Sequence, residues 1–453
     1  MGRLFGTDGA RGVAVTELTC ETAMQIGRAA AAVLCRTSGH KARILIGKDS
    51  RISSDIMEAA LTAGLLSVGA DVVSLGVVPT PAVAYLVKEL NADAGVMISA
   101  SHNSMEFNGI KLFAGTGFKL SDDIEEEIEA LVLDTPEKLI AMQKNGGEVG
   151  RLIKDRNAVD MYIKHLLSTG EKSLAGLKIA VDCANGSASA TAEKLFSGLG
   201  AKVYLLSCEP DGVNINDNCG STHLEPLTEF VREQGCDLGI AFDGDADRCL
   251  AVDEKGNVID GDKLIAIFAK DMNERDSLKK HAAVVTVMTN LGFTFFAKEN
   301  GIEMITTKVG DRYILEQMLA GGYTLGGEQS GHIIFRDFAT TGDGQLTAIQ
   351  LLSVMKRTGR SLSELASVME RYPQVMINVK ISQKWKEGWK NIERIESIIS
   401  EKEKELDGSG RILVRESGTE PLIRVMIEGR QFDRINDMAL AIADVIRECC
   451  PSD

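Results

Sequence analysis

Three stretches of the chain share one order of apolar and polar positions. Each begins with a continuous apolar run that ends in small polar residues, at residues 43–51, 178–186 and 283–291. Each continues with a helical stretch. A glycine closes that stretch and a second apolar run follows, at residues 69–73, 200–205 and 301–305. Continuous apolar runs are typical of strands buried on both faces of a parallel sheet, and a glycine before a strand is typical of a helix end. The repeat predicts three α/β domains of related topology.

The pattern changes after about residue 372. Residues 375–381 alternate as a half-exposed strand does, and residues 411–415 and 422–427 are expected as two further strands. One helical face is predicted to carry Ile392, Ile395, Ile398 and Ile399, and residues 432–449 form an amphipathic pattern. The tail is therefore predicted to be a separate small α+β domain.

The stretch 134–151 has weak periodicity, a proline and a pair of glycines, and is expected to be a linker with a domain boundary near its end. The fold class predicted is α/β, with three topologically related domains built on mixed sheets and a small C-terminal α+β domain. The expected boundaries are residues 1–153, 154–254, 255–370 and 371–453.

Composition narrows the class of protein. At 453 residues the chain is long enough for about three or four domains, and 44% apolar with 25% charged residues is typical of a globular protein. The N-terminus shows no leader pattern and no run is long enough to span a bilayer, so a cytoplasmic protein is expected. A net charge of −15 disfavours nucleic acid and anionic membranes as partners. Nine scattered cysteines without a CxxC pair are expected to be free thiols.

An acidic cluster follows a predicted strand. Asp243, Asp245 and Asp247 occupy alternate positions, which in an extended chain would direct three carboxylates to the same side. Their mutual repulsion favours a cation between them, and oxygen ligands in that number suit Mg²⁺. A solvated acidic turn is the alternative. An EF-hand is disfavoured because the downstream glutamate and flanking helices are missing.

A serine loop follows another predicted strand, at residues 94–98. It contains Ser101 and His102, and ligands gather at the carboxyl ends of strands in open α/β sheets. Taken alone, this Ser-His-Asn sequence is more often an ordinary turn.

Three further loops contain groups that suit a phosphosugar. Glu328, Ser330 and His332 combine acceptors and donors for sugar hydroxyls, and residues 307–312 could supply a neighbouring loop. Around Gly418, the turn 415–421 offers hydroxyls and backbone N–H groups to a phosphate but lacks the lysine of a P-loop, so a nucleotide is not implied. The Gly-rich segment 5–12 carries Arg11, which could meet an anion. Plain turns are the alternative for all three.

Together these five motifs, in the order in which they occur along the chain, resemble the α-D-phosphohexomutase superfamily. The similarity is strongest to its bacterial members that act on glucosamine phosphate, because of residues 2–12, Gln329 and the segment 309–313. The resemblance implies the four domains arranged around a central active-site cleft. It also implies interconversion of a hexosamine 6-phosphate and 1-phosphate through a phosphoserine and a bisphosphate intermediate. The product would feed the synthesis of UDP-N-acetylglucosamine in a bacterium.

The resemblance also implies roles for individual residues. Ser101 would be phosphorylated and would join the three aspartates around one Mg²⁺, while positive charge near the phosphate would come from Arg11, Lys111 and Arg248. The general base that takes the proton of the attacking hydroxyl could be His102, His332 or Lys111. The sugar would be bound by Thr307, Gly310, Asp311, Glu328, Ser330 and His332. The non-reacting phosphate would be bound by Arg415, Ser417, Gly418, Thr419 and Arg424.

One departure from the superfamily pattern falls in the serine loop. Ser104 stands where its members usually have proline, which leaves φ free there and predicts a more mobile loop. Alternatives to a glucosamine phosphate substrate are phosphoglucomutase or phosphomannomutase activity, a phosphatase with Asp243 as nucleophile, and a non-catalytic sugar-phosphate sensor. A monomer and a homodimer are both open.

Overall fold

The computed structural model describes residues 3–6, 8–36, 39–155, 157–386, 388–417 and 421–452. The chain forms two compact units. Unit 1 comprises Met1–Met288 and Gly301–Val368, and unit 2 comprises Thr289–Asn300 and Met369–Asp453. Among the described residues, no helix is both long enough and apolar enough to cross a membrane.

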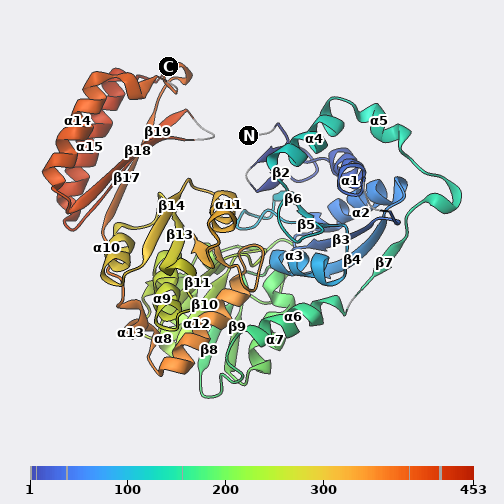
Figure 1. The fold of residues 1–453 in the computed structure, drawn as a ribbon, viewed down its shortest axis with the longest axis horizontal. Coiled ribbons are helices and arrows are strands. Elements are labelled where there is room, and N and C mark those ends of the chain that lie inside the picture. The colour runs from blue at the N-terminus through green and yellow to red at the C-terminus, as the bar shows by residue number, and fades with distance from the viewer. Residues whose placement is uncertain are drawn as a thin grey trace. The chain divides into compact units, whose positions relative to one another are not determined.

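The first sheet of unit 1 has seven strands in the order β1-β2-β6-β5-β3-β4-β7 (Figure 1). Its strands are β1 (Phe5–Gly6), β2 (Gly9–Val13), β3 (Arg43–Lys48), β4 (Asp71–Val77), β5 (Ala94–Ile98), β6 (Phe107–Ala114) and β7 (Leu152–Lys154). The neighbouring strands in the run β5-β3-β4-β7 are parallel. The pairs β1 with β2, β2 with β6 and β6 with β5 are antiparallel. Its helices are α1 (Cys20–Leu34), α2 (Ser53–Ser67), α3 (Thr80–Glu89), α4 (Asp122–Leu133) and α5 (Pro136–Ala141). The sheet is therefore mixed, as predicted.

The predicted linker at 134–151 is only partly irregular, and that prediction was wrong for its first half. A short helix, α5, begins at Pro136, a residue well suited to the first helical turn, and buries Leu139 in the core of this sheet. After a 3₁₀ turn at Gly146–Glu148, the chain adds β7 to the sheet edge beside β4. All three residues of β7 are exposed, so no apolar alternation marks the strand in the sequence.

The other two sheets of unit 1 are also mixed. One has the order β12-β11-β10-β8-β9, and the other β14-β13-β15-β16. Their strands are β8 (Lys178–Asp182), β9 (Lys202–Leu206), β10 (Leu238–Phe242), β11 (Cys249–Asp253), β12 (Val258–Ile259), β13 (Ala282–Thr286), β14 (Glu303–Thr307), β15 (Leu325–Gly327) and β16 (Ile333–Phe335). Their helices are α6 (Ala158–Thr169), α7 (Ala192–Gly198), α8 (Glu225–Gln234), α9 (Gly261–Glu274), α11 (Asp311–Gly321), α12 (Gly344–Thr358) and α13 (Leu362–Ala366).

The internal repeat is confirmed by strand pairing. In each sheet the two apolar runs of one repeat become parallel neighbours: β3 with β4, β8 with β9, and β13 with β14. Parallel neighbours require a crossover, and α2, α7 and α10 (Leu291–Glu299) provide it. The three α/β domains predicted from the repeat are therefore present.

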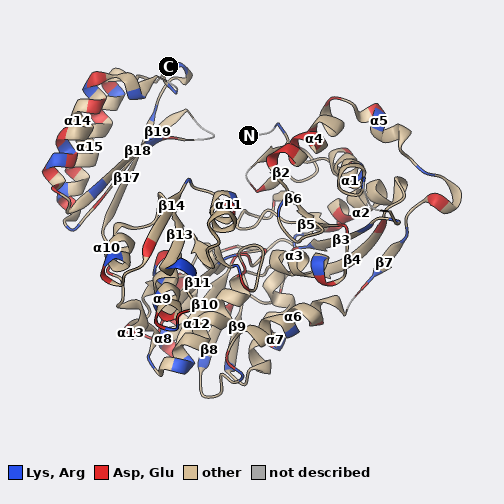
Figure 2. Ribbon diagram, in the orientation of Figure 1, with Lys and Arg blue, Asp and Glu red and all other residues tan. Residues whose placement is uncertain are grey.

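Unit 2 contains an antiparallel sheet in the order β17-β19-β18, formed by β17 (Gln374–Lys380), β18 (Gly410–Glu416) and β19 (Leu422–Gly429). Its long helices are α14 (Glu393–Leu406) and α15 (Phe432–Cys449), both of which carry acidic and basic residues (Figure 2). Buried Glu428 accepts hydrogen bonds from Asn290 Nδ2 at 3.0 Å and Leu291 N at 3.1 Å, which ties the start of α10 to this sheet. The predicted strands and helices of the tail are confirmed.

Candidate active site

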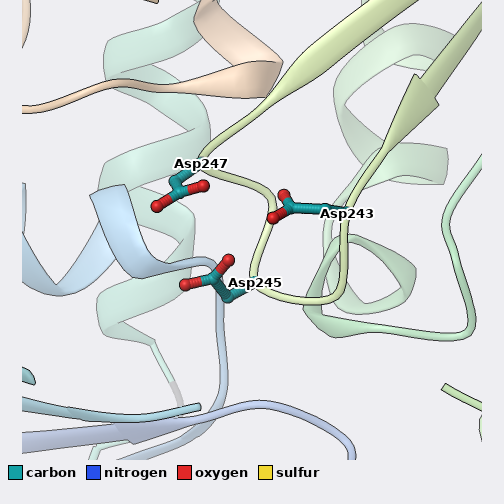
Figure 3. Close-up of side chains that lie close together, drawn as sticks. All are labelled: Asp243, Asp245 and Asp247. Carbon is teal, nitrogen blue, oxygen red and sulfur yellow. The ribbon is translucent and has the colours of Figure 1, made fainter. Parts of the chain in front are cut away.

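The three aspartates of the acidic cluster lie on a tight turn that joins the antiparallel strands β10 and β11. One oxygen from each carboxylate lies within 4.8 Å of the others, and all three residues are buried. Figure 3 shows the carboxylates of Asp243, Asp245 and Asp247 directed into a common space. Their gathering is confirmed, but its predicted cause, an extended chain, is wrong. The turn brings them together, and Ala246 takes a left-handed φ of 56° within it.

The hydrogen bonds of the cluster leave oxygens free for a cation. Asp245 Oδ2 accepts from Thr80 Oγ1 at 2.6 Å and from Lys111 Nζ at 2.8 Å. The remaining oxygen of Asp245 and one oxygen of Asp247 are buried without a hydrogen-bond partner in the described part of the chain. Buried acceptors without donors are costly, and hard oxygen ligands are what Mg²⁺ prefers. The cluster therefore fits a divalent cation.

The ionisation of the cluster is strongly perturbed. Burial, followed by the charges of Asp247 and Asp245, raises the pKa of Asp243 well above its usual range. Burial also acts to raise the pKa of Asp247, but Lys111 and His332 outweigh it and hold that pKa well below the usual range. Three carboxylates this close repel each other in a buried site, so a cation between them would stabilise the turn.

Ser101 lies beside this turn although it belongs to a different sheet. It follows β5, is 1% exposed, and donates a hydrogen bond from Oγ to Asp243 Oδ2 at 2.6 Å. Its backbone is left-handed, with φ of 52°, which costs a non-glycine residue about 1–2 kcal/mol. A Cβ at Gly244 would lie 2.6 Å from the Ser101 carbonyl oxygen, so only glycine allows the two loops to meet this closely.

His102 lies at the same place. Its Nδ1 is 3.4 Å from Ser101 Oγ and 3.1 Å from Arg248 Nη1. Burial and the charges of Arg248 and Arg11 lower the pKa of His102 to about 4, so the ring is neutral at neutral pH. Because Arg248 can only donate, Nδ1 must be the unprotonated nitrogen. The structure thus brings together four of the five residues predicted for catalysis with the acidic cluster, and Arg11 is close enough to affect the pKa of His102.

Lys111 links the cluster to the N-terminal Gly-rich segment, and Lys119 binds the same segment. Lys111 Nζ lies 2.8 Å from Asp245, 3.4 Å from Asp247 and 3.0 Å from Asp8. Burial opposes the charge on Lys111, but these carboxylates raise its pKa well above the usual value, so it is a fixed cation. Lys119 Nζ lies 2.5 Å from the other oxygen of Asp8. Neither Lys119 nor Asp8 was predicted as a site residue, and no motif in the sequence marks Lys119.

The ion pairs continue into the third sheet. Lys119 also pairs with Asp311 at the start of α11, and His332 Nε2 lies 3.6 Å from the same carboxylate. His332 Nδ1 lies 3.6 Å from Asp247. Burial lowers the pKa of His332, but the hydrogen bond and charge of Asp247 outweigh it, and the net shift is upward. Residues from all three α/β sheets therefore share one chain of alternating charges.

The two loops predicted to bind sugar are neighbours. Gly310, with φ of 130°, donates from its backbone N–H to Glu328 Oε1 at 3.1 Å. Thr307 ends β14 and donates from Oγ1 to the Lys308 carbonyl at 2.9 Å. Ser330 Oγ is buried and has no hydrogen-bond partner among the described residues. A hydroxyl in that state is available to a ligand.

Unit 2 contains the residues predicted to bind phosphate. Arg415 on β18 is paired directly with Arg424 on β19, so two cations face each other on one sheet. Burial and the charge of Arg424 lower the pKa of Arg415. Ser417 N donates to the Leu422 carbonyl at 2.9 Å, which begins the turn. Gly418 and Thr419 lie outside the described residues. Two adjacent guanidinium groups favour an anion as their partner.

Asp343, which the sequence analysis did not predict, is a buried carboxyl close to the acidic turn. It caps α12 by accepting from Leu346 N at 2.9 Å, and Tyr162 OH donates to it at 2.9 Å. The residue that follows it, Gly344, donates from N to the Ala246 carbonyl at 3.0 Å. Burial raises the pKa of Asp343 to about 7. At neutral pH this group is therefore only partly ionised.

A change of Asp343 to Asn is expected to flatten the pH dependence of stability. Because its folded pKa is raised, the folded state holds a proton that the unfolded chain releases above its ordinary pKa, and wild-type stability falls as pH rises toward about 7. Asparagine removes this loss, which is of the order of a few kcal/mol. Urea midpoints in chelator, at about pH 5 and about pH 8, should diverge for wild type more than for Asp343→Asn. Equal pH dependence in both proteins would contradict this assignment.

The sequence matches the models of one family along nearly the whole chain. The descriptions matched are phosphoglucomutase/phosphomannomutase alpha/beta/alpha domain I at residues 2–138, domain II at 160–256, domain III at 260–372 and the C-terminal domain at 376–445. The chain therefore belongs to the phosphoglucomutase/phosphomannomutase family, and its resemblance to the phosphohexomutases is confirmed.

Two curated relatives are both phosphoglucosamine mutases. The protein of Clostridium novyi is 53% identical over 449 residues, which cover 99% of each chain. That of Caldanaerobacter subterraneus is 54% identical over 446 residues, which cover 98% of this chain and 99% of the relative. A solved phosphoglucomutase/phosphomannomutase family protein from Burkholderia thailandensis has a TM-score of 0.81 at 23% identity and covers 99% of this chain and 98% of its own.

Proposed function

We propose that this chain interconverts glucosamine 6-phosphate and glucosamine 1-phosphate through a phosphoserine at Ser101. The observation that carries the proposal is the hydrogen bond of 2.6 Å between Ser101 Oγ and Asp243, which joins the predicted nucleophile to the acidic cluster from another sheet. The choice of glucosamine rests on the phosphoglucosamine mutases that are 53% and 54% identical over nearly the whole chain.

In this proposal Ser101 is phosphorylated in the active enzyme, and its phosphoryl group passes to the free hydroxyl of the sugar phosphate. The P–O bond to Ser101 breaks, a P–O bond to the sugar forms, and the hydroxyl proton passes to a protein base. The bisphosphate then turns and returns its other phosphoryl group to Ser101. One Mg²⁺ held by Asp243, Asp245 and Asp247, with an oxygen on Ser101, would neutralise charge on the transferring group.

The surrounding residues would supply the rest of the charge and alignment. Lys111 is a fixed cation, and Arg248 and Arg11 add two more charges around His102. A general base works best with a pKa near the working pH. His102, with a pKa of about 4, and Lys111, whose pKa is raised well above its usual value, are therefore both less suited than His332. The sugar would be bound by Thr307, Gly310, Asp311, Glu328, Ser330 and His332. The distal phosphate would be bound by Arg415, Ser417, Gly418, Thr419 and Arg424.

Two measurements test the proposal. Intact mass before and after phosphatase treatment, with peptide mapping, should show one phosphoryl group at position 101. The purified protein should convert glucosamine 6-phosphate with a catalytic efficiency at least about tenfold above that for glucose 6-phosphate. Preference for glucose would make the chain a phosphoglucomutase. A phosphoryl group removed by hydroxylamine would instead indicate an acyl phosphate on Asp243, and absence of turnover would indicate a sensor.

A further inference from the structure

The main chain of the serine loop is held by a buried guanidinium. Arg51 and Asp49 have fully buried side chains, and Arg51 Nε donates to Asp49 Oδ2 at 2.8 Å. Arg51 Nη2 donates to the carbonyls of Ser101 at 3.0 Å and Asn103 at 2.8 Å. Its Nη1 donates to the carbonyl of Phe107 at 3.1 Å and to that of Ser104. All five N–H groups of the guanidinium are therefore engaged.

The carboxylate of the same ion pair fixes the other side of Ser101. Asp49 Oδ2 accepts from Ser99 Oγ at 2.6 Å, and Ser99 Oγ in turn accepts from Ser101 N at 2.9 Å. Asp49 Oδ1 accepts from Ser54 Oγ at 2.9 Å. The N–H and the C=O of Ser101 are thus both set by one ion pair. This arrangement holds the residue in its left-handed conformation.

A second donor reaches the loop from the sheet that carries the acidic turn. Asn216 follows β9 and donates from Nδ2 to the carbonyls of Ser101 at 2.9 Å and Asn103 at 3.0 Å. A Cβ at Gly244 would lie 2.9 Å from this amide nitrogen, so Asn216 lies between the serine loop and the acidic turn. Asn216 itself is buried and left-handed, with φ of 58°.

We propose that Arg51 and Asn216 are positioning residues for phosphoryl transfer, and that they clamp the carbonyls of Ser101 and Asn103 from two sides. Arg51 sets the loop within its own domain, and Asn216 sets it relative to the acidic turn. Neither side chain needs to touch the substrate. The inference rests on the proposed function, since it assigns these residues to the placement of Ser101 Oγ.

This clamp also restrains the loop at Ser104. Proline at that position would fix φ covalently, and serine does not, but the carbonyl of Ser104 is bound by Arg51. The loop predicted to be mobile is therefore restrained by hydrogen bonds to its main chain. Phosphoryl transfer depends on alignment, so a small displacement of Oγ is expected to affect turnover much more than binding.

The decisive experiment compares Asn216→Asp with Asn218→Asp. Both asparagines have a left-handed backbone, but Asn218 is exposed and its amide donates to the neighbouring Asp217 at 2.9 Å. Aspartate at 216 has no N–H to donate, so it places a carboxylate oxygen against the carbonyl oxygens of Ser101 and Asn103. It should lower kcat on glucosamine 6-phosphate roughly 10–100-fold with little change in KM. Amide hydrogen exchange of residues 99–104 should become faster in this variant alone.

Arg51→Lys tests the other side of the clamp. Lysine keeps the charge beside Asp49 but has three donors in place of the planar fork, so kcat should again fall and exchange in the same loop should rise. Wild-type kcat in Asn216→Asp or in Arg51→Lys would overturn the proposal. So would faster exchange across the whole chain together with a lower thermal midpoint, which indicates a merely structural role. If wild type itself does not convert sugar phosphates, the proposed function fails, whereas loop exchange still reports on the clamp.

Discussion

Alanine at position 101 is expected to lower the rate of sugar-phosphate interconversion by roughly 10⁴-fold or more, because it removes the proposed nucleophile itself. Ser101 Oγ is the only side-chain oxygen of the serine loop whose hydrogen bond to the acidic turn the structure records within the described residues. Two neighbouring hydroxyls are already engaged: Ser99 Oγ bonds with Asp49 and with the backbone N–H of Ser101, and Thr80 Oγ1 donates to Asp245. The measurement is turnover of glucosamine 6-phosphate with added bisphosphate, so that the phosphorylation state of the purified protein does not limit the rate.

The matched control is Ser189→Ala. The Ser189 hydroxyl is buried and interacts with the Cys208 thiol, so its loss removes an oxygen and only a weak hydrogen bond. This variant should keep nearly full activity. The Ser101→Ala and Ser189→Ala proteins should have similar thermal midpoints, because alanine at 101 gives up one hydrogen bond, worth about 1 kcal/mol, and has the same Cβ as serine at the left-handed φ of 52°. Undiminished turnover in Ser101→Ala would exclude the phosphoserine route.

The fold was predictable where apolar periodicity decides it. The paired runs that become β3 with β4, β8 with β9 and β13 with β14 are buried, so their sequence records the sheet directly. The edge strand β7 was missed because it has only three residues, all exposed, and its two apolar residues are adjacent rather than alternating. Periodicity reports burial, and an edge strand held by backbone hydrogen bonds need not bury any side chain.

The site was predictable where residues are close in sequence. The aspartates at 243, 245 and 247 could be assigned as a group because any short turn keeps them together, even though the predicted extended geometry was wrong. The residues that no motif marked, such as Lys119 and Asn216, are those whose partners belong to another domain, Asp311 and Ser101 respectively. Their partners lie far away along the chain, and a single sequence holds no record of which distant residues meet.

Replacing Asp243 by Asn is expected to have opposite effects on stability and activity. In chelator the variant should be more stable than wild type, because it removes a buried carboxyl whose pKa is raised by burial and by two neighbouring aspartates. The amide can keep both hydrogen bonds of the side chain, since the Ser101 hydroxyl can accept as well as donate, and the Arg248 N–H can still reach the amide oxygen. The gain should therefore appear as a higher thermal midpoint.

With Mg²⁺ the order should reverse. A cation that binds only the folded protein stabilises it in proportion to the logarithm of its concentration over Kd, so wild type should gain with each addition while Asp243→Asn gains little. Turnover of the variant should fall roughly 10³-fold, since loss of a metal ligand removes several kcal/mol of charge stabilisation from the transition state. Asp337→Asn, at an exposed residue paired with Lys279, should change neither quantity. A variant that Mg²⁺ stabilises as strongly as wild type would show that the cation binds elsewhere, because the remaining two carboxylates alone carry too little charge to hold it equally well.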